Sequence, residues 1–285
     1  MEEIIFLNGS LLHRTQAKIS PFDHGFLYGY GLFETMRAYS GRIFRLERHL
    51  DRLIHSAKLI SLPLGIFDME EACYDTIKAN HLEDARIRLT VSMGEGEGRP
   101  DSPSQPIPTL LIVAQSFSSP LAEKYENGFK SMISSISRNS QSLISRLKSL
   151  NYMDNILARM EAKMAGADEA ILLNESGFLC EGSTSNIFLV SKGKLLTPNV
   201  ESGILPGITR EAVIELAHAL RIEVVERKVD VEELSQAEES FLTNSLIEIA
   251  PLVEIDDKPI SEGVVGGVTE RLMVAYRRLV ERETK

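Results

Sequence analysis

The chain has 285 residues, 43% of them hydrophobic and 25% charged, which is the composition of an ordinary globular protein. Its formal net charge of −10 argues against binding to the phosphate backbone of nucleic acid, which needs clustered Lys and Arg. We therefore expect a small-molecule partner and no nucleic acid.

The N-terminus and the cysteines indicate the compartment. The first residues, MEEIIFLNGS, lack the basic and apolar regions of a signal peptide, and no apolar run reaches the length of about 18 residues that spans a bilayer. The two cysteines, Cys73 and Cys180, are far apart and lack CxxC spacing, and the six histidines lack metal-ligand spacing. We expect a cytoplasmic protein with no membrane segment, no disulfide and no metal.

The N-terminal part of the chain predicts a sheet with two helices. Residues 3–7 end in the turn dipeptide Asn8-Gly9, which predicts a hairpin with the following short run. Residues 45–60 carry apolar side chains at a spacing near 3.6, which predicts a helix with one buried face. Asp68 can cap a second helix that ends near residue 80. Strands are predicted at residues 86–92, 109–115 and 129–136.

The C-terminal part predicts helices around a strand-rich region. Residues 151–165 predict a helix, and strand patterns separated by turn residues follow it, as in a meander or a small barrel. The helix has one apolar stripe, formed by Tyr152, Ile156, Leu157, Met160 and Met164. The strands are predicted at residues 170–174, 177–181, 186–190 and 194–197. After them we expect a helix at 208–220, a strand at 241–244, a polar loop, and a closing helix at 263–281.

The pattern breaks near residues 118–128, which we interpret as a domain boundary. The sequence therefore predicts an α+β protein of two domains. Residues 1–120 would form a small α/β sandwich, and residues 121–285 a larger β-barrel-like domain with helices.

Two charged residues, Lys148 and Glu181, lie at the ends of predicted elements, where functional groups concentrate. A lysine made nucleophilic can react with an aldehyde, and a glutamate can partner a pyridinium nitrogen. Pyridoxal phosphate requires both groups together with a phosphate cradle. The alternative is that they are two solvated surface charges, which is the commoner role of both residue types.

Candidates for the phosphate cradle are also present. Residues 206–210 place backbone N–H groups and the Thr209 hydroxyl at a helix N-terminus, and residues 243–245 offer a similar set. Arg52, on the helix predicted at 45–60, would add a positive charge. Each feature alone is also typical of a helix cap or a solvated arginine, so only their combination is specific.

That combination resembles the class IV pyridoxal-phosphate enzymes of fold type IV, which include branched-chain aminotransferases, D-amino acid aminotransferases and aminodeoxychorismate lyases. The matching segments follow one another along nearly the whole chain. They are FLNG at 6–9, DHGFLYGYGLFETMR at 23–37, FRLERHLDRL at 44–53, RIRLTVSMG at 86–94, KSLNYMDNILARMEAKMAGADEAILLNESGFLCEGSTSNIF at 148–188, ESGILPGITR at 201–210 and FLTNSLIEIAPL at 241–252.

The resemblance implies roles for individual residues. It makes Lys148 the Schiff-base lysine, carried by the larger C-terminal domain with the cofactor between the two domains. It makes Glu181 the partner of the pyridine nitrogen and places Tyr152 near the phenolic oxygen. The implied phosphate ligands are Arg52, Ile208, Thr209 and Ser245. It also implies pyridoxal 5'-phosphate as cofactor, amino acid and 2-oxo acid substrates, and a homodimer.

Substrate identity stays open at this point. Thr35, in a Phe-Glu-Thr context, resembles the lyase branch, whereas Arg88 resembles a strand arginine of branched-chain enzymes that can bind a substrate carboxylate. Glu34 and Arg37 are interpreted as structural partners within one turn. We favour an aminotransferase that moves an amino group from a branched-chain amino acid to a 2-oxo acid such as 2-oxoglutarate. The alternatives are a lyase that makes 4-aminobenzoate, a D-amino acid aminotransferase, and a non-catalytic protein that keeps the fold.

Overall fold

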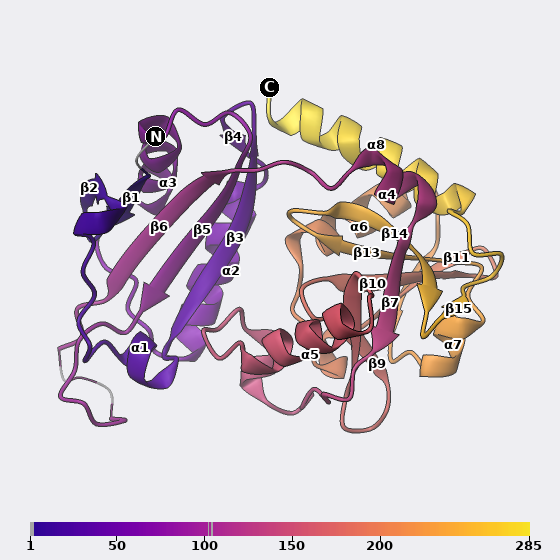
Figure 1. Ribbon diagram of the computed structural model, residues 1–285, viewed down its shortest axis with the longest axis horizontal. Coiled ribbons are helices and arrows are strands. Elements are labelled where there is room, and N and C mark those ends of the chain that lie inside the picture. The colour runs from indigo at the N-terminus through magenta and orange to yellow at the C-terminus, as the bar shows by residue number, and fades with distance from the viewer. Residues whose placement is uncertain (1–2, 102, 104) are drawn as a thin grey trace. The chain divides into compact units, whose positions relative to one another are not determined.

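The computed structural model describes residues 3–101, 103 and 105–285, which fold into two compact units (Figure 1). The first unit holds the chain up to Ser118 together with Leu147–Asn151 and Arg282–Lys285. The second holds Ser119–Arg146 and Tyr152–Glu281. Helices and strands occur in both units, which confirms the predicted α+β class.

The first unit contains a six-stranded antiparallel sheet in the order β2-β1-β6-β5-β3-β4. The predicted hairpin is confirmed, because Asn8 and Gly9, with φ of 48° and 90°, form the turn that joins β1 to β2. The strands are β1 (Ile4–Leu7), β2 (Ser10–His13), β3 (Gly31–Tyr39), β4 (Arg42–Ile43), β5 (Ala85–Ser92) and β6 (Thr109–Ser116).

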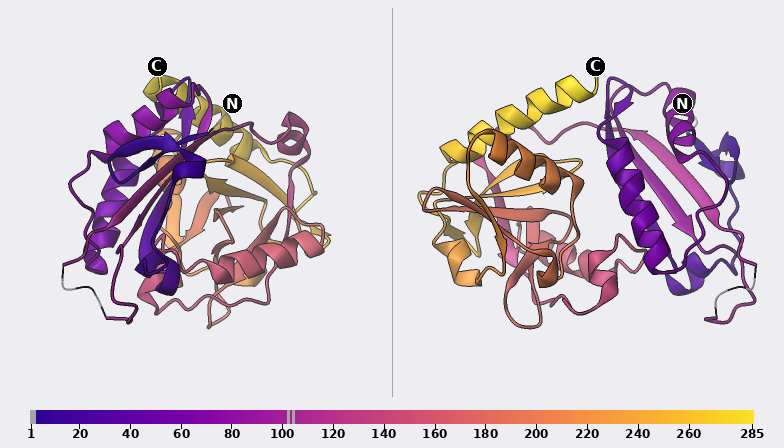
Figure 2. Two further views of the ribbon diagram at one scale, coloured as in Figure 1. Left: turned by 60° about the vertical axis from the view of Figure 1, so that its left-hand side comes forward. Right: turned by 180° about the vertical axis from the view of Figure 1, so that it is seen from behind.

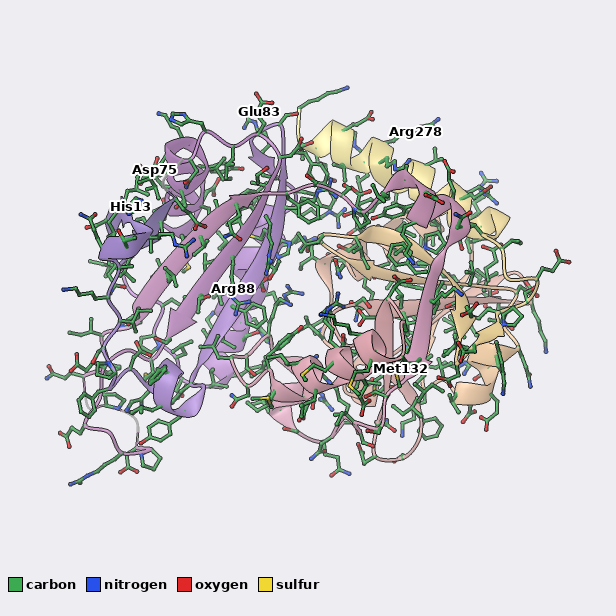
Figure 3. The ribbon with its side chains drawn as sticks, in the orientation of Figure 1. His13, Asp75, Glu83, Arg88, Met132 and Arg278 are labelled. Atoms are coloured by element: carbon green, nitrogen blue, oxygen red, sulfur yellow. The ribbon has the colours of Figure 1, made fainter. Side chains whose placement is uncertain are left out.

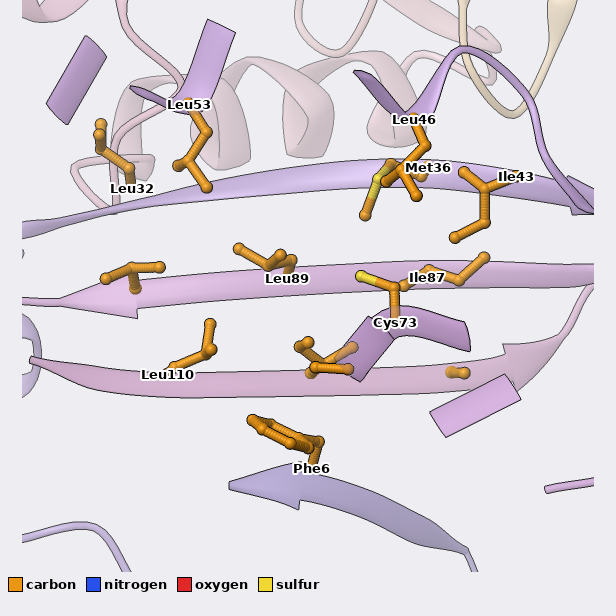
Figure 4. Close-up of a cluster of buried hydrophobic side chains, with 14 of the residues drawn as sticks. Phe6, Leu32, Met36, Ile43, Leu46, Leu53, Cys73, Ile87, Leu89 and Leu110 are labelled. Atoms are coloured by element: carbon orange, nitrogen blue, oxygen red, sulfur yellow. The ribbon is translucent and has the colours of Figure 1, made fainter. Parts of the chain in front are cut away.

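Two predicted helices lie on one face of this sheet and complete a hydrophobic core (Figures 1 and 2). Leu53 of the first helix packs in this core with Leu32 and Met36 of β3 (Figure 4). The predicted Asp68 cap is confirmed, since its carboxylate accepts the Glu71 N–H at 3.0 Å. The helices are α2 (Leu46–Leu59) and α3 (Met69–Ala79), and the same unit contains α1 (His24–Tyr28) and the short 3-10 helix η1 (Arg14–Gln16).

Strand β3 was not predicted from the sequence. Glu34, Thr35 and Arg37 interrupt its apolar pattern, yet most of the strand is buried on both faces between β5 and β4. Glu34 and Arg37 also do not pair within a turn. Arg37 stacks on the rings of Tyr39 and Phe117, at 4.3 and 4.9 Å from its guanidinium carbon.

The segment Leu147–Asn151 differs from the sequence-based expectation. We expected it in the C-terminal domain, but it packs in the first unit because it adds to the free edge at the start of β3. The Phe33 N–H donates to the Lys148 carbonyl at 2.8 Å, and the Leu150 N–H donates to the Gly31 carbonyl at 3.0 Å. Lys148 therefore has its backbone fixed by a sheet of the first unit.

The second unit is built on a nine-stranded sheet in the order β12-β11-β10-β13-β14-β7-β8-β9, with β15 paired to β14. The strands predicted from residue 129 to residue 197 and at 241–244 are confirmed, with bounds that differ by a few residues. These confirmed strands are β7 (Phe129–Ile133), β8 (Glu169–Leu173), β9 (Leu179–Gly182), β10 (Asn186–Ser191), β11 (Lys194–Pro198) and β13 (Glu239–Asn244). The strands β12 (Val224–Arg227), β14 (Glu248–Ile255) and β15 (Lys258–Pro259) were not predicted.

The polar loop expected after residue 244 is wrong, because β14 lies there in the middle of the sheet. Most of β14 is buried on both faces, so its sequence does not alternate between apolar and polar residues. Pro251 pairs with Phe241 of β13, and the pairing with β7 begins only at Leu252. The missing N–H of Pro251 is thus tolerated.

The helices of the second unit are α4 (Ala122–Asn127), α5 (Met153–Met164), α6 (Ile208–Ala219), α7 (Val231–Ser235) and α8 (Gly267–Glu283), with the 3-10 helices η2 (Leu143–Arg146) and η3 (Val200–Ser202). The last two residues of α8 are assigned to the first unit. The predicted helices α5, α6 and α8 are confirmed. In the part of the chain that the structure describes, no helix has the length and apolarity required to cross a membrane.

Helix α5 does not bury the predicted apolar stripe. Its buried residues are Asn155, Ala158 and Ala162, which pack toward the sheet. At 100° per residue the apolar stripe lies on the opposite side of the helix. The exposed fractions are 47% for Ile156, 40% for Leu157, 54% for Met160 and 86% for Met164.

Candidate active site

Lys148 lies against the ring of Phe33 in the first unit. The Lys148 Nζ is 4.7 Å from the centroid of that ring, while the backbone of the same lysine pairs with Phe33. Phe33 is buried and held in β3 between neighbouring strands. The face of the ring attracts the ammonium group, so this contact holds the Lys148 Nζ beside β3.

Arg88 and Thr35, both predicted from the sequence, are directly opposite each other on β5 and β3. The guanidinium carbon of Arg88, labelled in Figure 3, is 3.9 Å from the centroid of the Phe33 ring. Two residues apart on a strand, Phe33 and Thr35 share one face of the sheet. The structure thus brings Thr35, Arg88 and Lys148 together around Phe33, a residue that the sequence analysis did not select.

Arg52 is a partly buried residue of α2 and pairs with Glu34 of β3. Its Nε donates to Glu34 Oε1 at 2.9 Å and its Nη2 donates to Oε2 at 2.6 Å, which is a two-point pair with a fixed plane. His49, three residues earlier on the same helix, lies 2.8 Å from Glu34 Oε2 through Nδ1. Both Glu34 and His49 are 1% exposed.

The charges in this cluster follow from its contacts. Burial alone would raise the pKa of Glu34, but the adjacent Arg52 and the hydrogen bond from His49 lower that pKa to about 2. Burial lowers the pKa of His49 below its ordinary value, although its bond to Glu34 acts in the opposite direction. Near neutral pH the cluster therefore contains a carboxylate, a guanidinium and a neutral imidazole whose proton is on Nδ1.

In the second unit, Glu181 of β9 is buried and bound by three groups. Its Oε2 accepts the Leu205 N–H at 2.9 Å and the Asn186 amide at 3.1 Å, and its Oε1 lies 2.9 Å from Arg138 Nη2. Arg138 is fixed in turn by the carbonyls of Gly203 and Ser145, at 3.1 and 2.7 Å. The Glu181 carboxylate therefore has a defined orientation.

Ile208 and Thr209 form the buried first turn of α6. The N-cap of this helix is Gly207, and no side chain caps it. A Cβ at Gly207 would be only 2.0 Å from the Asn186 Oδ1, so glycine is required here by close packing. Asn186 bonds to both Glu181 and the Leu205 carbonyl, which links the predicted nitrogen partner to the predicted phosphate turn.

Tyr152 lies at the N-cap of α5, where its hydroxyl donates to the Ser183 carbonyl at 3.2 Å. The loop at residues 183–185 is organised by Glu169, a buried residue of β8 that the sequence analysis did not select. Its carboxylate accepts hydrogen bonds from the hydroxyls of Ser183, Thr184 and Ser185. Tyr152 is thus placed through a loop that Glu169 holds.

Ser245 lies in the turn between β13 and β14. The Asn244 Oδ1 accepts the N–H groups of Leu246 and Ile247 at 2.8 and 2.9 Å, and its amide donates to the Thr184 carbonyl at 3.0 Å. The turn that carries Ser245 is therefore tied to the loop at residues 183–185. Among the predicted residues of this unit, Tyr152 and the turn of Ser245 thus both contact the loop at residues 183–185, and Glu181 contacts Leu205, which precedes the turn of Ile208 and Thr209.

These residues fit pyridoxal 5'-phosphate. An N-terminal helix turn without a side-chain cap leaves backbone donors for an anion. The Thr243 hydroxyl is buried, and no hydrogen-bond partner for it occurs among the described residues. In the first unit Lys148 is an amine and Arg52 a cation, and in the second unit Glu181 is a carboxylate and the Ser245 turn is polar; these are the kinds of group that the cofactor requires.

Known proteins are similar to this chain in sequence and fold. Residues 31–255 match the family model described as Amino-transferase class IV. A chain from Methanocaldococcus jannaschii, provisionally named a branched-chain-amino-acid aminotransferase, is 41% identical over 276 residues, covering 96% of this chain and 95% of its own. The Escherichia coli (strain K12) branched-chain-amino-acid aminotransferase is 34% identical over 292 residues, covering 99% and 94%.

Solved structures agree with these matches. The crystal structure of the Escherichia coli branched-chain amino acid aminotransferase has a TM-score of 0.94 at 34% identity and covers 100% of this chain and 97% of its own. That of the branched-chain amino acid aminotransferase from Thermobaculum terrenum, in its pyridoxal-phosphate form, has a TM-score of 0.86 at 32% identity and covers 99% and 95%.

The fold and the match to the family model define a pyridoxal-phosphate enzyme of fold type IV, as the sequence predicted. The chain belongs to the class IV aminotransferase family and is a pyridoxal-phosphate-dependent transaminase. Four residues that hold the predicted ones were not predicted from the sequence, namely Glu34, His49, Arg138 and Glu169. In the sequence, each of them is a charged or imidazole side chain within a segment that is otherwise typical of buried structure. Such a residue cannot be assigned a role until the residues that it contacts are known.

Proposed function

We propose that this transaminase moves an amino group from a branched-chain amino acid to a 2-oxo acid such as 2-oxoglutarate. The observation that carries the proposal is the identity of 34% to 41% with branched-chain aminotransferases over nearly the whole chain. The cluster of Lys148, Arg88 and Phe33 supports it, because an apolar ring beside two cations suits a substrate with an aliphatic side chain and a carboxylate.

We propose that both units supply cofactor ligands, as the predicted residue roles require. When bound, pyridoxal phosphate accepts the electrons released at the substrate Cα. Lys148 Nζ would take the covalent position and then act as the general base that moves the Cα proton. Glu181, held by Arg138 and Asn186, would keep a proton on the ring nitrogen. Tyr152 would approach the phenolic oxygen.

The proposed phosphate ligands come from two elements and one turn. Arg52 would contribute charge-assisted hydrogen bonds. The backbone N–H groups of Ile208 and Thr209 would bind the anion at the start of α6, where the helix dipole also favours it. Ser245 would add its hydroxyl. Thr35 and Arg88 would contact the substrate.

We propose a homodimer in which a second copy of the chain covers the apolar stripe of α5. The stripe is contiguous and lies opposite the buried face of the helix, whereas monomers seldom expose grouped large apolar side chains. A cytoplasmic location is also proposed, because Cys73 and Cys180 are both buried free thiols.

An amino-donor screen tests the function. The purified protein, saturated with pyridoxal phosphate, is offered each amino acid with 2-oxoglutarate, and glutamate formation is measured. Leucine, isoleucine and valine should be the best donors. A parallel assay measures 4-aminobenzoate from aminodeoxychorismate, and D-amino acids are included in the donor set. Activity only in the 4-aminobenzoate assay, or only with D-amino acids, would exclude the proposed substrate.

A further inference from the structure

Glu34 occupies a position where an apolar residue would be expected. On β3 it alternates with Leu32 and Met36, which are buried in the core under α2. A buried charge is costly unless it is paired, and a hydrophobic side chain of similar size often serves stability as well or better. The presence of a carboxylate here therefore points to a task other than packing.

The pair between Glu34 and Arg52 fixes the plane of the guanidinium. The carboxylate binds Nε–H and one Nη2–H at 2.9 and 2.6 Å, so rotation about the end of the arginine side chain would break a buried two-point pair. The edge of the guanidinium that carries Nη1 consequently has one fixed direction. Planar, pre-oriented donors of this kind suit the oxygens of a phosphate.

His49 fixes the carboxylate from a second side. Because the low pKa of Glu34 keeps it ionised, it can only accept, and the His49 Nδ1 must donate at 2.8 Å. His49 and Arg52 are three residues apart on α2, so one face of one helix contributes both partners. The carboxylate is thus bound by the imidazole and the guanidinium together.

We propose that Glu34 and His49 are positioning residues that hold the Arg52 guanidinium in the orientation in which it binds the cofactor phosphate. This inference rests on the proposed role of Arg52 as a phosphate ligand. If the pair only joined β3 to α2, its loss would change the stability of the fold and the affinity for every ligand alike. If the pair positions Arg52, its loss should weaken the binding of a ligand that carries the phosphate more than that of one without it.

The test compares pyridoxal 5'-phosphate with pyridoxal, which has the same ring and aldehyde but no phosphate. Dissociation constants for both are measured by absorbance titration with wild type, Glu34→Gln, His49→Gln, Arg52→Gln and the Glu34→Gln/Arg52→Gln double variant. Thermal unfolding without added ligand shows whether each variant is folded. The matched control is Glu233→Gln, which removes another two-point glutamate partner of an arginine, Arg227, at 2.8 and 2.6 Å.

Glu34→Gln should weaken the binding of pyridoxal phosphate by roughly tenfold and that of pyridoxal by less than about twofold. His49→Gln should produce a smaller loss with the same selectivity, and the double variant should be no weaker than Arg52→Gln alone. Glu233→Gln should leave both constants unchanged. If Glu34→Gln does not fold, His49→Gln gives the same comparison.

Three results would overturn the inference in distinguishable ways. If Arg52→Gln weakens both ligands equally or neither, the proposed phosphate site is wrong and the inference falls with it. If Arg52→Gln is selective for the phosphate while folded Glu34→Gln and His49→Gln are not, only the inference is wrong. Tighter binding by Glu34→Gln would likewise show that the carboxylate acts by repelling the phosphate and not by orienting the arginine.

Discussion

Single side chains in this enzyme acquire their properties from partners that are distant in the sequence. Glu181 is an ordinary glutamate in the sequence, but in the fold it accepts the Leu205 N–H and the Asn186 amide and pairs with Arg138. Each bond restricts the carboxylate to one orientation. A group oriented before the ligand arrives loses less conformational freedom on binding, which is the advantage of such an arrangement.

Glu181→Gln should separate cofactor binding from turnover. The amide keeps the shape of the side chain and one acceptor oxygen, which can still accept the Leu205 N–H and the Asn186 amide, but it loses the contact with Arg138 and the charge that would hold a proton on the ring nitrogen. We expect nearly unchanged cofactor affinity and a half-reaction with an amino donor slowed by about a hundredfold or more, since each tenfold corresponds to about 1.4 kcal/mol of barrier. Single-turnover absorbance measures the rate.

The control for this variant is Glu175→Gln, which alters a carboxylate that binds the Ser140 N–H and hydroxyl in the same unit. It should react at the wild-type rate. A Glu181→Gln enzyme as fast as wild type would mean that Glu181 does not partner the ring nitrogen.

His49 should make the stability of the fold depend on pH. Because burial lowers its pKa below the ordinary 6.5, the unfolded chain binds a proton before the folded chain does as the pH falls. The contribution of neutral His49 to the free energy of unfolding is therefore complete above pH 6.5 and is lost as the pH falls below it. The free energy of unfolding should change by up to about 1.4 kcal/mol per pH unit. Urea unfolding of His49→Gln from pH 5 to 7.5 should show a shallower dependence than wild type.

His55→Gln is the matched control, because His55 is exposed on the same helix. His55→Gln should keep the wild-type dependence of stability on pH.

At lower pH, protonation of Glu34 also destabilises the fold. Its pKa of about 2 lies below the ordinary 4.5, so its stabilising effect is lost between these two values as the pH falls. Equal slopes for His49→Gln and wild type would show that His49 is not buried in its neutral form.

At the scale of elements, the sequence predicted what local periodicity can encode. Along its whole length, helix α2 has one side in the core and the other side in water, so its apolar residues recur with the helical period. The predicted β1 and β2 hairpin depends on two turn residues alone. Strand β14 lacks such a signal, because burial on both faces removes the alternation that marks a strand.

The same limit applies to the candidate site. Lys148, Glu181 and Thr209 could be selected because they lie at the ends of predicted elements, within segments that follow one another in the order found in class IV pyridoxal-phosphate enzymes. Glu34 and Arg138 were not, because their roles depend on pairing with residues on other elements. For α5 the periodicity predicted the helix but not which side of it is buried, since small alanines on the other side allow closer approach to the sheet.

Gly207→Ala tests the link between the start of α6 and Glu181. The backbone at this position is extended and accepts an alanine, but the new Cβ would be 2.0 Å from the Asn186 Oδ1 and must displace it. We expect roughly tenfold weaker cofactor binding and a lower melting temperature. The control is Gly267→Ala, at the start of α8, where a Cβ meets nothing within 4 Å. Unchanged cofactor affinity in Gly207→Ala would show that this turn does not contact the phosphate.

At the scale of the whole molecule, the exposed stripe of α5 is the surface that the proposed homodimer would cover. Ile156, Leu157, Met160 and Met164 lie opposite the side that packs on the sheet, so folding of one chain does not bury them. Burial of such side chains contributes roughly 25 cal/mol for each Å² removed from water. In a symmetric dimer the stripe of one copy would pack against the stripe of the other, so that both would be buried.

Charge on this stripe should therefore dissociate the assembly. The double variant Leu157→Asp/Met160→Asp places two carboxylates in each half of the proposed interface. There they would lose their water and lie next to the carboxylates of the partner. We expect the double variant to sediment as a monomer at concentrations where wild type sediments as a dimer. Ile66→Asp is the control, because Ile66 is 97% exposed in a loop of the other unit and should leave the sedimentation coefficient unchanged. A dimer that survives both α5 substitutions would place the interface elsewhere, and a wild-type protein that is monomeric at all concentrations would remove the need for one.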